Sequence, residues 1–316
     1  MSKRAFLMWG VILFVLLTGL AQQAHAVAVP LARSEHAPGV ASFNSQIHVF
    51  YIRYPDNRIV YQTTTNGSAW SGEILVPLGT TPKNKLSAMA YNNLLYLFYS
   101  SASGSSLKYR TLDLAGTWSG EGTVSNAATD DGPGLAVFNN LLYVFWETAG
   151  GGSDSIRYST FNTSNAQSGV SVVPFGLTFR SPAAAVFNNR LYLAYSGTNG
   201  SSTNGSEIYH GYMDANGFWV GDSRPTGDPR TRTGPALAPL GTELWLMYLP
   251  KSTLEPDDLY HKRLNTLGQW TAESLIVPLS QSETGVSATF FNNRIWLVGG
   301  MLTGVDPRSV QYYILQ

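Results

Sequence analysis

The stretch P-A-A-A-V-F-N-N-R-L-Y-L-A-Y, which runs from Pro182 to Tyr195, occurs in varied form six times along the chain. Its aromatic-Asn step falls at positions 43, 91, 138, 187, 240 and 291, where the fifth copy carries Leu-Gly instead. Successive copies are therefore 48, 47, 49, 53 and 51 residues apart. A regular spacing of this length is typical of repeat folds, in which each copy forms one structural unit.

Each copy predicts a β-hairpin followed by two more strands. The Asn188-Asn189 dipeptide tolerates the positive φ angles that a type I′ hairpin turn requires. The residues after it are apolar on both faces, which indicates a strand that is buried on both sides. A third strand with a recurrent aromatic residue follows. We expect a tryptophan to open the fourth strand, at Trp70, Trp118, Trp219 and Trp270.

Four antiparallel strands in about 48 residues describe one blade of a β-propeller. The sequence therefore predicts an all-β fold, a six-bladed β-propeller of four-stranded antiparallel blades. The sixth copy stops before its Trp strand, whereas residues 27–40 are similar to residues 274–286, which contain a fourth strand. We expect this N-terminal strand to complete the last blade and so to close the ring, which protects the strand edges.

The first 26 residues differ from the rest of the chain. Lys3 and Arg4 precede an apolar run from Ala5 to Leu20, and 24–26 is a small-x-small sequence, Ala-His-Ala. This pattern predicts a secretory signal peptide over 1–26, with residues 27–316 forming a single propeller domain. An uncleaved membrane anchor is the alternative. We expect export to the periplasm or the cell exterior, with no membrane association once the peptide is removed.

The composition narrows the possible partners. Twenty basic and twenty acidic residues give no net charge, so bulk electrostatics do not favour nucleic acid. The chain has no cysteine, and its five histidines lack metal-ligand spacing, so we expect no cofactor. Ca²⁺ bound by Asp130-Asp131 or Asp257-Asp258 is a weaker possibility than solvated loop carboxylates.

The loops divide into two groups. The turns between first and second strands and between third and fourth strands are short and share one face. The loops between second and third strands and the links between blades share the other face, and they carry most of the charges. Function commonly lies on variable loops that a rigid scaffold supports, so we expect the ligand face there.

Aromatic residues that end the second strands are candidates for sugar binding, because a ring offers an apolar face and a polar edge. They are Tyr51, Tyr99, Trp146, Tyr195 and Tyr248. Charged residues on the same face complete the predicted sites in clefts between blades, namely Arg53, Glu147, Arg180, Arg230 and Arg232. Packing between blades is the alternative role for the aromatic residues.

The repeats resemble those of exported propellers with phrases such as Ala-x-x-Phe-Asn-Asn-x-Leu-Tyr followed by Trp-Ser. The six copies, Trp70-Ser71, Trp118-Ser119 and the ring closure are similar to the fungal fucose-lectin family. That resemblance implies a non-catalytic protein that binds glycans or glycoconjugates in clefts between blades, through an Arg, a Glu and aromatic residues. The Glu that the family carries on its third strand is replaced here by Tyr61, Tyr109, Tyr158 and Tyr260.

Two further functions stay open. The segments Asp113–Trp118 and Asp214–Trp219 are similar in part to the Asp-box of sialidases, which are also six-bladed propellers. A sialidase-like glycoside hydrolase needs a pair of suitably spaced carboxyl groups, and we expect one deep central pocket with converging arginines. A platform that binds another protein is the third hypothesis, and it predicts a large exposed apolar patch.

Overall fold

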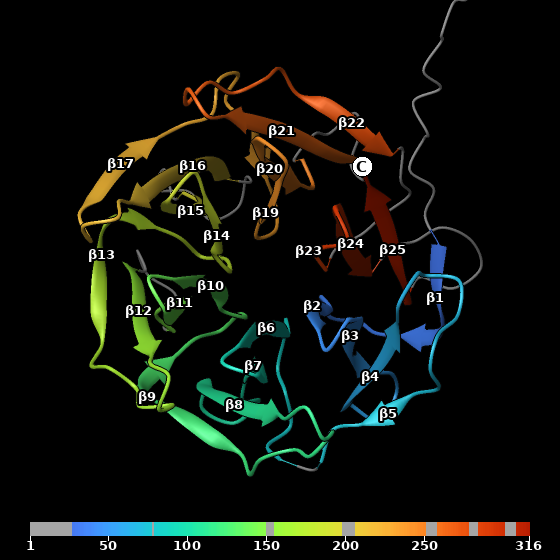
Figure 1. Ribbon diagram of the computed structural model, residues 1–316. Helices are drawn as coiled ribbons and strands as arrows, with labels where there is room; N and C mark the ends of the chain where they lie inside the picture. The colour runs from blue at the N-terminus through green and yellow to red at the C-terminus, as the bar shows by residue number, and fades with distance from the viewer. Residues whose placement is uncertain are drawn as a thin grey trace, which may run out of the picture.

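The computed structural model describes residues 27–77, 79–149, 155–197, 206–250, 258–277, 284–300 and 308–316. In these ranges the chain forms strands β1 to β25, arranged as six sheets around a central axis (Figure 1). The all-β, six-bladed propeller is therefore confirmed. The predicted signal peptide lies outside the described residues. Within them, there is no helix long and apolar enough to cross a lipid bilayer.

Blades are numbered I to VI in chain order, each from its inner to its outer strand. Blade I contains β2 (Gly39–Phe43), β3 (Gln46–Arg53), β4 (Arg58–Thr64) and β5 (Ile74–Leu75). Blade II contains β6 (Ser87–Tyr91), β7 (Leu94–Ser100), β8 (Ser106–Leu112) and β9 (Gly122–Ala128). Blade III contains β10 (Gly134–Phe138), β11 (Leu141–Glu147), β12 (Ser155–Phe161) and β13 (Ser171–Leu177).

Blade IV contains β14 (Ala183–Phe187), β15 (Arg190–Ser196), β16 (Ser206–Met213) and β17 (Trp219–Ser223). Its third strand also pairs with the short β18 (Arg230–Thr231), which the repeat pattern does not predict. Blade V contains β19 (Ala236–Leu240), β20 (Glu243–Tyr248), β21 (Leu259–Asn265) and β22 (Ser274–Val277). Blade VI contains β23 (Val286–Phe291), β24 (Arg294–Gly300), β25 (Ser309–Leu315) and β1 (Val27–Arg33).

The N-terminal strand closes the ring. Strand β1 pairs antiparallel with β25, with Val27 opposite Tyr312 and Arg33 opposite Ser309. Blade VI thus takes three strands from the end of the described chain and its outer strand from the beginning (Figure 1). The first and last blades cannot separate without breaking this sheet, as the sequence comparison predicts.

The hairpin turns follow the predicted chemistry. Asn92 and Asn93 have φ angles of 49° and 61°, the left-handed conformation that asparagine tolerates and a type I′ turn requires. Asn188 and Asn189 repeat these values at 48° and 55°. These tight turns fix the register of the inner two strands in each blade, so the same face of every strand meets the neighbouring blade.

The hydrophobic core is a ring of six interfaces between adjacent blades. One cluster joins Phe43 and Phe50 of blade I to Leu95 and Leu97 of blade II, and five similar clusters continue around the ring. Side chains on both faces of each sheet are therefore buried, which explains why the second strands are apolar throughout.

The tryptophans begin the pairing of the fourth strand in three of the four blades. Trp219 opens β17, and Trp118 and Trp270 form isolated bridges with Leu112 and Leu264 of the third strands, a few residues before the continuous outer strands. Trp70 lies four residues before β5. The tryptophan rings pack backward onto the preceding blade, as Trp118 does against Tyr61 with ring centroids 5.9 Å apart. The repeated tryptophan thus packs its own blade against the preceding blade, and the continuous outer strand of blades I, II and V begins a few residues after it.

Candidate functional site

Six links, the segments that lead into each inner strand, converge on the propeller axis and form a polar basin of about 410 Å³. Every blade contributes to it. Its charged and ring-bearing lining residues are Glu35, His36, Lys83, Lys85, Asp130, Asp131, Phe179, Arg180 and Arg232. The basin lies on the face of the second-to-third strand loops, because both kinds of segment lie at the same end of the blades. This is the face on which the sequence places the ligand.

Charges of both signs line the basin, four cations against three carboxylates. Lys83 Nζ lies 2.6 Å from an oxygen of Asp130, and the Ser105 hydroxyl donates to the same oxygen over 2.7 Å. Glu35 accepts a hydrogen bond of 2.7 Å from Arg308 Nε at the rim. Burial lowers the pKa of His36 despite the opposing effect of Glu35, so this ring is neutral near pH 7.

The wall of the basin beneath Asp131 carries a hydrogen-bonded network. Lys85 Nζ lies 3.2 Å from the hydroxyl of Ser181, and the backbone N–H of Ser181 donates to Asp131 over 3.0 Å. Buried Glu147 accepts hydrogen bonds of 2.8 Å from the N–H of Asp131 and 2.5 Å from the Thr129 hydroxyl. These bonds join the links of blades III and IV and hold Asp131 in a fixed orientation.

Burial sets the protonation of this network. It lowers the pKa of Lys85, although the carboxylates of Asp131 and Glu147 oppose the change. Burial, with a further contribution from the nearby Asp131, raises the pKa of Glu147 to about 7, against a smaller opposing effect of the Thr129 hydroxyl. Protons can therefore be gained or lost beside the basin near neutral pH.

The predicted arginines fall in different places. Arg180, which is exposed, and Arg232 both line the basin. Arg53 instead binds Asp56 and Glu73 at the outer part of blade I. Arg230 lies 3.2 Å from a carboxylate oxygen of Glu207 across the β16–β18 pairing, away from the basin residues.

The five predicted aromatic residues do not present their rings to solvent. Their exposed fractions are 0% or 1%, and they are Tyr51, Tyr99, Trp146, Tyr195 and Tyr248. The rings are covered because the second strand lies inside each sheet and faces a neighbouring blade on both sides. The expectation that these rings form stacking surfaces in open clefts is therefore corrected. Glu147 is likewise buried, with 2% exposed.

The buried tyrosines instead donate to carboxylates that lie in the outer strand or directly before it. Tyr51 and Tyr99 donate to Glu73 and Glu121, each over 2.6 Å. The same pairing occurs between Tyr195 and Asp222 and between Tyr248 and Glu273. Each carboxylate lies three residues after the tryptophan position of its blade. Burial raises the pKa of all four tyrosines, and the adjacent carboxylates raise it further.

A smaller cleft of about 180 Å³ lies between blades I and II. The turn residue Asp56 and Arg58, the first residue of β4, line one side of it, and Thr80 and Tyr99 line the other. Glu121 accepts two hydrogen bonds from Thr80, 2.7 Å from its N–H and 2.5 Å from its hydroxyl. The corresponding second-to-third strand loops of blades III to VI include residues outside the described ranges.

The repeat pattern does not single out Lys83, Lys85 or Phe179 as site residues. A usable signal exists in the sequence, because every basin residue lies a few positions ahead of an inner strand. The described residues include no group of three or more His, Cys, Asp or Glu side chains that could hold a metal ion. Asp257 lies outside them, so the calcium hypothesis stays a prediction.

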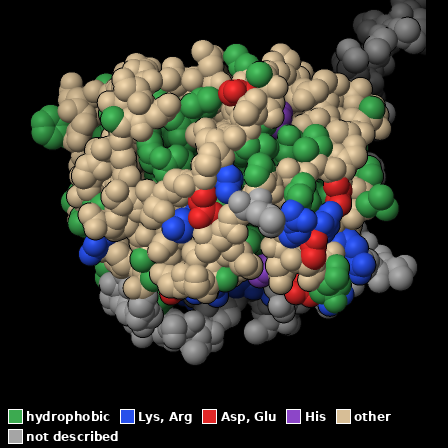
Figure 2. Space-filling view, turned by 90° about the horizontal axis from the view of Figure 1, so that it is seen from below, with side chains coloured by type: hydrophobic (Ala, Val, Ile, Leu, Met, Phe, Trp, Pro, Cys, Tyr) green, Lys and Arg blue, Asp and Glu red, His purple; other side chains and the backbone are tan. Residues whose placement is uncertain are grey.

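Figure 2 shows the rim of the propeller from the side, with most of the visible charged side chains in the lower half of the view and much of the hydrophobic surface in the upper half. The most exposed large apolar residues, Leu31, Leu267 and Phe218, belong to three different blades, VI, V and IV. The protein-platform hypothesis stays a prediction.

No protein-family model matches the sequence, and no curated protein sequence matches it significantly. Solved structures with similar folds include the Aleuria aurantia lectin in complex with Fucα1-6GlcNAc, at 15% identity and a TM-score of 0.65, covering 90% of this chain and 93% of the lectin. The phage phi92 endosialidase has 10% identity and a TM-score of 0.65, with 93% and 69% covered. Penicillium chrysogenum α-L-arabinanase, complexed with arabinobiose, has 13% identity and a TM-score of 0.62, with 91% and 94% covered. The fold is thus that of lectin-like and sialidase-like propellers.

Proposed function

We propose that the protein is a carbohydrate-binding, lectin-like propeller and that the axial basin is its principal glycan site. The observation that carries this proposal is the convergence of six links into one polar basin with side chains of both signs. This position differs from the clefts between blades that the sequence favours. The small cleft between blades I and II is a second, weaker candidate.

The chemistry of the basin suits a polyhydroxylated ligand. Sugar hydroxyl groups both donate and accept hydrogen bonds, so they can use arginine and lysine N–H groups together with carboxylate oxygens. The partly buried ring of Phe179 offers an apolar surface within the same basin. A polyanion such as nucleic acid would instead encounter the carboxylates of Asp130 and Asp131.

The similar structures support a sugar ligand in general terms, since those above are described as a lectin, an endosialidase and an arabinanase. Their identities to this chain, 10% to 15%, do not indicate which sugar is bound. Export directed by residues 1–26, to the periplasm or the cell exterior, is part of the proposal. Loss of these residues from the purified protein, measured as intact mass, would test it.

Glycan-array binding of the purified protein, with and without EDTA, tests the proposal. We expect a related set of glycans to bind, and the double substitution Arg180→Ala/Arg232→Ala to weaken binding at least 10-fold, because charge-assisted hydrogen bonds to the ligand are lost. Arg230→Ala is the matched control, since Arg230 pairs with Glu207 outside the basin. An array without binding, or equal losses in both variants, would contradict the basin assignment. Sensitivity to EDTA would support bound Ca²⁺.

A sialidase-like glycoside hydrolase is the alternative, and an axial basin with two arginines favours it over a set of equivalent lectin sites. The same purified protein should be assayed with fluorogenic glycosides of the sugars that bind. Turnover that Asp131→Asn abolishes while binding persists would replace the lectin proposal with a hydrolase.

A further inference from the structure

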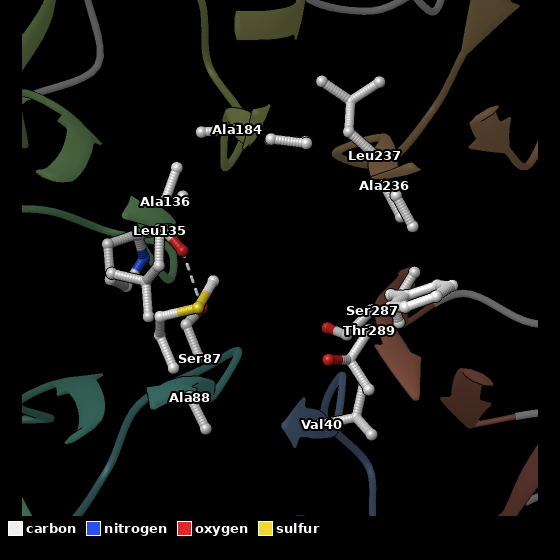
Figure 3. Close-up of a pocket in the computed structure, with 18 of the residues that line it drawn as sticks. Val40, Ser87, Ala88, Leu135, Ala136, Ala184, Ala236, Leu237, Ser287 and Thr289 are labelled. Carbon is white, nitrogen blue, oxygen red and sulfur yellow. Dashed lines mark hydrogen bonds between the residues drawn. The ribbon is translucent and has the colours of Figure 1, made fainter. Parts of the chain in front are cut away.

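An apolar channel continues along the axis beneath the basin. Its volume is about 320 Å³, and the inner strands of all six blades line it (Figure 3). Lys85 lines both the basin and the channel. Each link also runs directly into the inner strand below it, as Ser181 of the basin leads to Pro182 of the channel. The basin and the channel are therefore adjacent parts of one axial site.

The channel has a regular lining. Several residues of each inner strand line it, and at one repeat position among them the side chains alternate between larger and smaller around the ring, in the order Val40, Ala88, Leu135, Ala184, Leu237 and Ala288. In Figure 3, labelled residues from all six inner strands surround an open centre. The hydroxyl of Ser87 is satisfied by a hydrogen bond of 2.6 Å to the carbonyl oxygen of Pro133.

Lys85 marks the junction between the polar and apolar parts. Its side chain reaches from the link of blade II to Ser181 in the link of blade IV, and its backbone packs on Gly132 between them. A Cβ at Gly132 would lie 2.7 Å from the carbonyl oxygen of Lys85, so only glycine permits this approach. The lysine methylenes can cover an apolar chain while the ammonium group stays among the polar groups of the basin.

We propose that the axial site binds glycoconjugates with an apolar aglycone, the sugar in the basin and the aglycone in the channel. The sugar half of this inference rests on the proposed function. The occupant is an alkyl chain of the kind that alkyl glycosides and glycolipids carry, since the channel is lined mainly by apolar side chains and is continuous with a polar entrance. Burial of each methylene group removes apolar surface from water and so strengthens binding.

Isothermal titration of the full-length protein with methyl, butyl, hexyl and octyl β-D-glucopyranoside, below micelle-forming concentrations, tests the inference. We expect the dissociation constant to fall about 2- to 4-fold for each added methylene that enters the channel. The same alkyl series on the sugar that binds best on the glycan array should show the same dependence from a tighter starting value.

The substitution Ala184→Leu tests the location. It introduces the residue that blades III and V carry at the equivalent positions, Leu135 and Leu237, and it narrows the channel. We expect octyl glucoside to bind at least 10-fold more weakly, with methyl glycoside binding unchanged. Ala115→Leu, at an exposed hairpin turn, is the matched control. Thermal unfolding of both variants verifies folding, and Ala288→Leu is a second channel variant if Ala184→Leu is unstable.

The outcomes separate this inference from the proposed function. Glycan binding without any dependence on alkyl length would overturn the inference and leave the lectin proposal intact. Length dependence that Ala184→Leu or Ala288→Leu abolishes would support the channel even if the array is silent, because the apolar contribution is measured directly. Length dependence that survives both substitutions would place the alkyl chain elsewhere and refute the inference.

Discussion

Two carboxylates, Glu121 and Glu147, hold successive links of the propeller with similar hydrogen bonds. Glu121 of blade II accepts from the N–H and hydroxyl of Thr80 in the link that enters blade II. Glu147 of blade III accepts from the N–H groups of Asp130 and Asp131, in the link that enters blade III. Each carboxylate also accepts a hydrogen bond from a hydroxyl group, that of Tyr99 for Glu121 and that of Thr129 for Glu147.

Their pKa values nevertheless move in opposite directions. Burial opposes ionisation of Glu121, but the hydrogen bonds from Thr80 and Tyr99 and the nearby Lys108 outweigh it, so its pKa lies below the usual value. Burial raises the pKa of Glu147 to about 7, with Asp131 adding to the effect. The hydrogen bonds alone therefore do not decide the charge. The depth of burial and a second nearby carboxylate decide it, and Glu147, beside the axial basin, has both.

The difference in burial between Glu121 and Glu147 should have its largest effect on stability when each side chain is removed. At pH 5, where Glu147 is protonated, Glu147→Ala should lower the free energy of unfolding by about 3 kcal/mol, because buried N–H groups lose their acceptor. Glu121→Ala should cost about 1 to 2 kcal/mol, since water can reach the freed groups. Urea denaturation of both variants measures this. Equal losses would contradict the difference in depth.

The pH dependence of stability should carry the sign of the Glu147 shift. Between pH 4.5 and 7 folded Glu147 binds more protons than the unfolded chain, so its contribution to stability falls as pH rises through this window. Wild type should therefore lose on the order of 2 kcal/mol relative to Glu147→Gln between pH 5 and 7.5. The difference curve is needed because His48, His210 and His261, with pKa values of about 4, act in the opposite sense. A flat difference would refute the shift.

The sequence predicts the ring well because its determinants are local. The Asn188-Asn189 turn and the apolar strand after it specify a hairpin, and the likeness of 27–40 to 274–286 specifies the closure. The Tyr–carboxylate pairs are harder to predict, because Tyr99 reaches Glu121 across the intervening third strand. The sequence does show a carboxylate three residues after each tryptophan. It does not show that this carboxylate meets a tyrosine, because that contact depends on how the strands pair.

The basin could be predicted only in part for a similar reason. Arg180 and Arg232 belong to links, and links face the expected side of the propeller, but which links meet on the axis depends on the closed ring. Lys85 gives no local signal, since its importance comes from Ser181, 96 residues away. The aromatic residues mislead because tyrosine at a strand end suits either a sugar or a neighbouring blade, and here the blades cover it.

The smallest expected effect is that of Glu121→Gln on stability. Its dependence on pH should be opposite in sign to that of Glu147→Gln. The pKa of folded Glu121 is depressed, so its ionised form contributes stability above the unfolded value, and this contribution is lost as pH falls through the folded pKa. Glu121→Gln should therefore cost about 1 kcal/mol at pH 7 and almost nothing in strong acid. Urea titrations of the two glutamine variants at matched pH values measure both slopes. If stability changes with pH in the same direction at both sites, one cause common to all buried carboxyl groups would govern them. The electrostatic distinction between Glu121 and Glu147 would then be wrong.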